Sequence, residues 1–125
     1  MRLFAALATL VGCGDDVPDC VELPAECTPQ YPATFDAVWS NTLATSCALS
    51  GCHATGAGEL TMGTTPETAY AALLDGGYVK PGDPECSEMV VRIETPGEDG
   101  MPPSAMLDDA ERCAVAAWVR EGAEP

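Results

Sequence analysis

The residues of this chain best suited to chemistry are two cysteines, Cys47 and Cys52, with His53 directly after the second. Two thiols in such a pattern can form thioethers with the vinyl groups of a porphyrin, and the imidazole can bind its iron from one face. The usual attachment sequence has two residues between the cysteines, whereas this chain has four. His53 is also the only histidine in the 125 residues. We therefore predict one covalent haem c held by Cys47 and Cys52, with His53 as an axial ligand.

Two other chemistries remain open for the same cysteines. Cys47 and Cys52 could form a disulfide if the chain turns back between them. A zinc site usually takes four Cys or His ligands in two close pairs. This chain has no second close pair of cysteines that we do not expect to form disulfides. The sequence has no local signature of a Ser/His/Asp triad and no Gly-rich phosphate-binding fingerprint. Haem attachment is favoured over the disulfide, and the disulfide over zinc.

The N-terminal residues have the pattern of an export signal. Arg2 precedes an apolar run at residues 3–11, which is typical of a secretory signal and too short to span a bilayer. The sequence LVGC at residues 10–13 resembles a bacterial lipobox, which implies cleavage before Cys13 and a diacylglycerol on its sulfur. We expect a signal peptide at 1–12 and a membrane-anchored lipoprotein in the periplasm or on the cell surface. An ordinary signal peptide cut nearby is the alternative.

The charge of the chain limits its partners. It has 20 acidic and five basic residues, a formal net charge of −15, and loss of the signal peptide removes only Arg2 among the charged residues. Such a surface repels nucleic acid and anionic lipid, so we expect no nucleic-acid binding and a protein partner with a basic docking face. Solubility alone also accounts for an acidic surface.

Seven cysteines favour an exported, disulfide-forming protein, although the number is odd. If Cys13 carries lipid and the pair at 47 and 52 carries haem, four cysteines remain, with three possible pairings. These four are Cys20, Cys27, Cys86 and Cys113. Because the first two are close in a proline-containing loop, we expect them to pair, which leaves the last two as the second bridge.

Apolar spacing and capping residues predict an all-α fold of about four short helices with long loops. Residues 13–33 are acidic and proline-rich without a period, so we expect a tether there and a folded domain at 34–125. The expected helices run over about 35–47, 66–75, 84–93 and 109–121. A small domain with so few apolar residues needs covalent crosslinks or a bound group to be stable.

Several motifs together resemble a known family. They are, in order, Phe35…Trp39…Leu43, Cys47…Cys52-His53, Val79-x-Pro81-Gly82-Asp83-Pro84, Met101-Pro102-Pro103 and Trp118-Val119-x-x-Gly122-Ala123. Over residues 34–123 the chain resembles the short mono-haem cytochrome c domains of bacterial exported and outer-membrane proteins. The resemblance implies a cytochrome c-like fold around one haem, electron transfer rather than catalysis, and Met101 as the second axial ligand. The four-residue gap between the cysteines departs from the family pattern.

The second axial ligand has several candidates among the methionines. No second histidine exists, so a thioether sulfur is the natural soft donor, and a Met/His pair raises the reduction potential of haem. Met101 precedes two prolines that stiffen its loop, whereas Met89 lies on an apolar helical face and is expected in the core. Met62 and Met106 remain as loop donors.

Two other functions stay open beside electron transfer. One is a disulfide-stapled surface lipoprotein without haem that acts as a binding or structural module. The other is a haem enzyme or gas sensor with an open axial site, which carbon monoxide or cyanide binding would reveal.

Acylation of Cys13 is directly testable. Cys13→Ser should release the protein into the soluble exported fraction or block its processing, because acyl chains contribute about 0.8 kcal/mol per buried methylene to membrane attachment. The intact mass of the wild-type protein should correspond to a chain that starts at Cys13 and carries lipid. An unmodified N-terminus at another residue would contradict the prediction.

Overall fold

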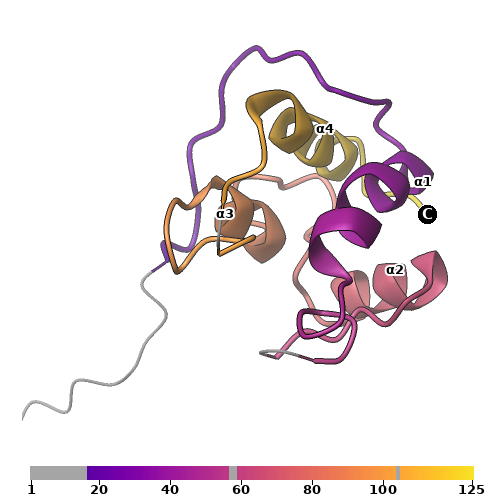
Figure 1. Cartoon of the computed structure of the whole chain (residues 1–125). Helices are drawn as coiled ribbons and strands as arrows, with labels where there is room; N and C mark the ends of the chain where they lie inside the picture. The colour runs from indigo at the N-terminus through magenta and orange to yellow at the C-terminus, as the bar shows by residue number, and fades with distance from the viewer. Residues whose placement is uncertain (1–16, 57–58, 104) are drawn as a thin grey trace, which may run out of the picture.

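The computed structural model describes residues 17–56, 59–103 and 105–125. Within these ranges the chain forms helices and no strand (Figure 1), which confirms the all-α expectation. The elements are α1 at Phe35–Val38, the π-helix η1 at Trp39–Cys47, α2 at Pro66–Asp75, α3 at Glu88–Glu94 and α4 at Asp109–Arg120. The expected signal peptide at 1–12 and Cys13 lie outside the described residues. No helix in the described part is long and apolar enough to cross a membrane.

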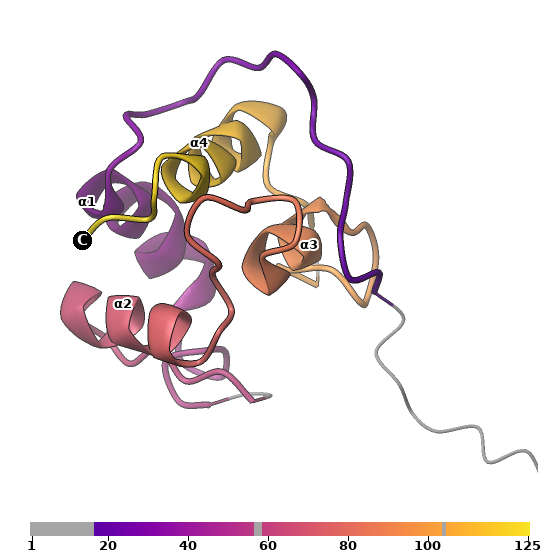
Figure 2. The ribbon, with the colours of Figure 1, turned by 180° about the vertical axis from the view of Figure 1, so that it is seen from behind.

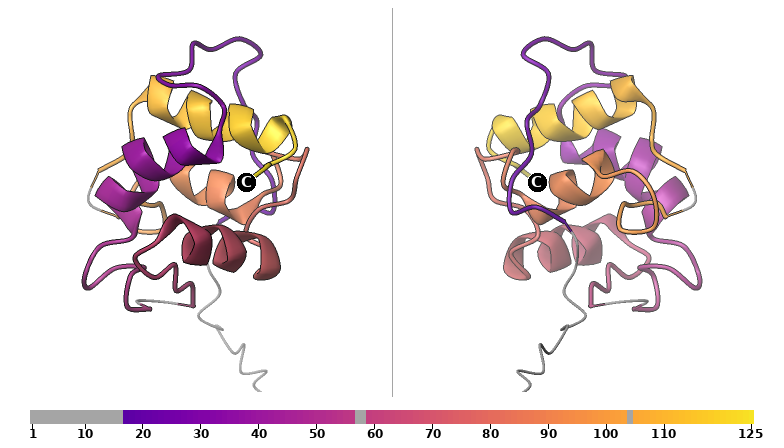
Figure 3. Two further views of the ribbon diagram at one scale, coloured as in Figure 1. Left: turned by 90° about the vertical axis from the view of Figure 1, so that its right-hand side faces the viewer. Right: turned by 90° about the vertical axis from the view of Figure 1, so that its left-hand side faces the viewer.

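The helices pack around a small aromatic core. α4 lies across α1 and α3, and α2 lies on the opposite side of the molecule (Figures 2 and 3). Trp118 on α4 is 1% exposed, and its ring centroid lies 5.3 Å from that of Phe35 on α1. Tyr70 on α2 closes the cluster, with its centroid 5.0 Å from Phe35. The aromatic side chains therefore join three helices that are distant in sequence.

The predicted helix starts at three positions are confirmed by their caps. Thr34 accepts a hydrogen bond from the Ala37 N–H at 3.3 Å, and Thr65 accepts one from the Thr68 N–H at 3.2 Å. The Asp108 carboxylate accepts one from the Glu111 N–H at 2.8 Å. Each bond satisfies a backbone donor that the first helical turn leaves free.

The first helix extends to Cys47 as predicted, but its second part is a π-helix. Its last bond runs from the Ala48 N–H to the Leu43 carbonyl at 2.7 Å, five residues back. The wider turn is rare and often occurs at functional sites. The apolar spacing of the sequence does not distinguish it from an α-helix.

Helix α3 begins later than predicted, at Glu88 rather than at Asp83-Pro84. The fully buried Ser87 hydroxyl accepts from the Lys80 N–H at 2.8 Å and donates to the Asp83 carbonyl at 2.8 Å. A side chain that satisfies backbone groups in this way stabilises a turn in place of a helix. Cys86 consequently precedes α3 and does not lie on it.

The predicted disulfide pairing is wrong. The bonds are Cys20–Cys86 and Cys27–Cys113, with sequence separations of 66 and 86 residues. The Val21 N–H donates to the Glu85 carbonyl at 2.8 Å, so the chain near Cys20 lies beside the turn before α3. Because extended chain advances about 3.3 Å per residue, Cys27 lies far from Cys20 and bonds to α4 instead.

Residues 17–33, which we call the strap, arch over α3 and α4 (Figure 1). The Gln30 N–H donates to the Ala110 carbonyl at 2.9 Å, and Tyr31 is buried, with 8% of its surface exposed. We expected a tether from residue 13 to 33 and a domain starting at 34. The described part of that segment instead packs against the folded domain, because two disulfides attach it to the turn before α3 and to α4.

Peptide mapping without reduction should find Cys20 linked to Cys86 and Cys27 linked to Cys113. Replacing Cys27 and Cys113 together by alanine should lower the free energy of unfolding by about 4 kcal/mol, because a long loop in the unfolded chain is released. Denaturant titration measures this change. A peptide that links Cys20 to Cys27 would contradict the pairing.

Candidate functional site

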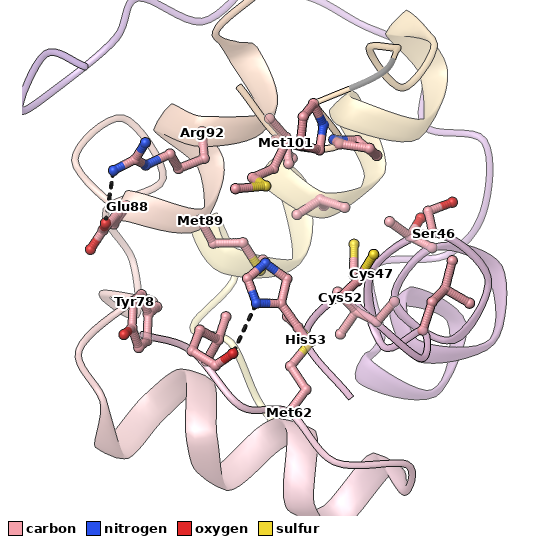
Figure 4. Close-up of a pocket in the computed structure, with 18 of the residues that line it drawn as sticks. Ser46, Cys47, Cys52, His53, Met62, Tyr78, Glu88, Met89, Arg92 and Met101 are labelled. Atoms are coloured by element: carbon pink, nitrogen blue, oxygen red, sulfur yellow. Dashed lines mark hydrogen bonds and ion pairs between the residues drawn. The ribbon is translucent and has the colours of Figure 1, made fainter. Parts of the chain in front are cut away.

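A cavity of about 580 Å³ opens between η1 with its following loop, α3, and the loop before α4 (Figure 4). Half of the residues that line it are leucine, isoleucine, valine, proline or methionine. The four residues that the sequence singles out also line it. They are Cys47, Cys52, His53 and Met101. The fold thus brings a motif at 47–53 together with a methionine that lies some fifty positions later in the chain.

The four-residue gap between the cysteines is accommodated by a turn. Gly51 has φ +78°, a backbone conformation that other residues rarely adopt. The Cys52 N–H donates to the Leu49 carbonyl at 2.9 Å, and the His53 N–H donates to the Cys47 carbonyl at 3.1 Å. This last bond brings the histidine back beside the first cysteine, so the longer spacing still gathers all three side chains at one cavity.

Cys47 and Cys52 are both free thiols, so the structure does not form the disulfide that the sequence left open. Cys47 ends η1 and is partly buried, while Cys52 is exposed. Burial raises the pKa of the Cys47 thiol to about 11, and the nearby charges of Glu111 and Cys52 add to the effect. This thiol is therefore protonated at neutral pH when the cavity holds no bound group.

The imidazole of His53 has a defined orientation. Its Nδ1 lies 2.9 Å from the Leu60 carbonyl oxygen, which can only accept, so Nδ1 carries the proton in the neutral ring. The Met62 N–H donates to the His53 carbonyl at 2.7 Å and fixes the backbone. Nε2 keeps its lone pair, and Figure 4 shows this nitrogen directed into the cavity, towards Met89 and Met101. A carbonyl that orients the ring is a common partner of metal-binding histidines.

The methionines divide into three groups. Met101 lines the cavity, and its N–H donates to the Arg92 carbonyl at 2.9 Å, which attaches its loop to α3. Met62 and Met89 are buried, at 2% and 8% exposure, and both also line the cavity. The expectation that Met89 belongs to the core is confirmed. Met106 is 41% exposed and is not part of the cavity wall.

Two further residues with polar side chains line the cavity, Tyr78 and Arg92. Tyr78 has no sequence signal, whereas Arg92 is one of the few basic residues that could face a haem propionate. Within the described part, Arg92 is the only lysine or arginine that lines the cavity; it pairs with Glu88 at 3.6 Å and donates to the Asp99 carbonyl at 3.1 Å. Desolvation raises the pKa of Tyr78, and the charges of Glu59 and Glu88 raise it further. Arg92 lies three positions after Met89, and this helical spacing places the two on one face of α3.

The donor set and the cavity fit a covalently bound haem. Such a group needs a mostly apolar cavity, free thiols at its wall and an oriented imidazole nitrogen, and these occur together here. In the described ranges no group of three or more His, Cys, Asp or Glu side chains is arranged to bind a metal ion directly. Comparisons with family models, curated proteins and solved structures gave no match for this chain.

Proposed function

We propose that this chain is the haem-binding domain of an exported, lipid-anchored c-type cytochrome that transfers single electrons. One observation carries the proposal: the His53 imidazole, with Nδ1 held by the Leu60 carbonyl, shares a mostly apolar cavity with two free cysteines (Figure 4). A histidine oriented in this way beside two thiols is what covalent haem attachment requires.

Each site residue has a defined part in this proposal. Cys47 and Cys52 provide the thiols for two thioether bonds, and His53 and Met101 provide nitrogen and sulfur donors for the iron. When bound, the haem supplies a one-electron couple at its iron. The Leu60 carbonyl orients the imidazole, and the apolar wall excludes water from the donors.

The acidic surface favours a redox partner with a basic docking face. Glu59 and Glu88 belong to the cavity wall, so the negative charge of the whole chain extends to the site itself. Charge complementarity of this kind steers association and speeds encounter more than it adds affinity. The proposed lipid on Cys13 would keep the domain at the membrane where such a partner resides.

The main alternative is a disulfide-stapled binding or structural module without haem. The two disulfides agree with it, but they agree equally with a haem protein of this size. The alternative leaves unexplained why Cys47 and Cys52 stay free and line one cavity with an oriented histidine.

Covalent attachment predicts a red protein that keeps its haem in denaturing gels when it is matured in a host competent for haem c. Replacing Cys47 and Cys52 together by alanine should abolish the covalent haem stain, because no thiol then remains at the cavity wall. The matched control is Ser50→Ala, which changes an exposed residue between the two cysteines without removing a thiol and should retain the stain. A colourless wild-type protein would rule the proposal out.

Met101 as the second ligand predicts a weak sulfur-to-iron band in the far-red spectrum of the oxidised protein. Met101→Ala should remove the band and lower the reduction potential, since a thioether ligand raises it. Met106→Leu is the control, because that side chain is exposed and outside the cavity wall. If the band survives in Met101→Ala and disappears in Met62→Leu or Met89→Leu, the ligand is one of those two buried methionines.

A further inference from the structure

Three hydrogen-bonded side chains next to the cavity have no part in the proposed function. They are Tyr31 on the strap, Thr42 on η1 and Glu111 on α4. The Thr42 hydroxyl donates to the Glu111 carboxylate at 2.7 Å, and the Tyr31 hydroxyl lies 2.6 Å from the Thr42 oxygen. Because the single proton of Thr42 goes to the carboxylate, Tyr31 is the donor to Thr42. Tyr31 is 8% exposed and Thr42 is 1% exposed, so these two side chains lie inside the protein.

These hydrogen-bonded side chains adjoin the candidate haem site. Thr42 lines the same cavity as Cys47, which lies five residues later on η1. Glu111 is half-buried and is not itself part of the cavity wall, so its carboxylate lies behind Thr42. Its charge reaches both neighbours, since it contributes to the raised pKa of Cys47 and to that of Tyr31.

No ion pair within the described residues neutralises Glu111. The nearest cation on α4, Arg112, is directed elsewhere: it pairs with Glu94 at 3.2 Å and with Asp109 at 2.6 Å. Arg112 also donates to the Leu107 carbonyl. Glu111 lies in the first turn of α4, where the helix dipole favours a negative charge. The bond from the buried Thr42 hydroxyl therefore holds this carboxylate in place.

We propose that Glu111, held in place by Thr42 and Tyr31, provides a fixed negative charge that lowers the reduction potential of the haem carried at Cys47 and Cys52. The inference rests on the proposed function. A fixed negative charge stabilises the oxidised form, which carries one more positive charge than the reduced form. A half-buried charge has a larger effect than an exposed one, because the effective dielectric constant around it is lower than in water.

The test is the reduction potential of the haem-loaded Glu111→Gln protein at neutral pH. Glutamine keeps an oxygen that can accept from Thr42 and removes only the charge. The potential should rise, and the rise should persist between about 0.05 M and about 1 M salt, because screening acts mainly on exposed charges. Glu121→Gln is the matched control: it removes the same charge from an exposed residue just after α4, and its smaller effect should fade with salt.

Variants of Thr42 separate positioning from charge alone. Thr42→Val leaves the carboxylate without its buried donor and should raise the potential by part of the Glu111→Gln shift, whereas Thr42→Ser keeps the hydroxyl and should restore the wild-type value. If Thr42→Val does not fold, Tyr31→Phe, which removes only the outer donor, should give a smaller rise in the same direction.

A red protein whose potential is unchanged in Glu111→Gln, or changes only as much as in Glu121→Gln, would overturn this inference and leave the proposed function standing. A colourless wild-type protein would instead remove the proposed function, and the inference with it.

Discussion

The architecture depends on two covalent bonds that join the strap to the turn before α3 and to α4. Helix α3 has seven residues and α1 has four, lengths at which an isolated helix is unstable in water. The bonds Cys20–Cys86 and Cys27–Cys113 close loops of 66 and 86 residues and so remove much of the freedom of the unfolded chain. They also hold extended chain against α3 and α4, which brings Tyr31 into contact with Thr42. The strap therefore serves both stability and the wall of the site.

The site depends on a second, weaker constraint. The hydrogen bond from the His53 N–H to the Cys47 carbonyl closes the turn that contains Gly51. Without that turn, a gap of four residues would place the histidine well away from the first cysteine. The Leu60 carbonyl then fixes which imidazole nitrogen is free. Two backbone carbonyls thus define the position and the tautomer of the only histidine in the chain.

Local features of the fold could be predicted from the sequence, whereas features set by distant contacts could not. The caps at Thr34, Thr65 and Asp108 involve neighbours three residues away, so the sequence contains them in full. The start of α3 depends on a Ser87 hydroxyl that bonds a residue seven positions earlier, and the disulfide pairing depends on the path of extended chain.

The same distinction holds for the candidate site. The motif at 47–53 is local, so the sequence contains it in full, whereas Met101 is indicated only by the resemblance to a family. Arg92 and Tyr78 reach the cavity only through tertiary packing.

The cavity lies where few contacts between helices hold the small core together. The cavity wall comes from η1, the loop after it, α3 and the loop before α4, and most of that wall is apolar. Within the described part, α3 packs mainly on α4, and η1 packs mainly on α1, so little direct helix contact joins the two sides of the cavity. An apolar group between them would add the missing contacts and would stabilise the folded state through its binding free energy. In a domain of this size the proposed haem would thus complete the core as well as supply the chemistry.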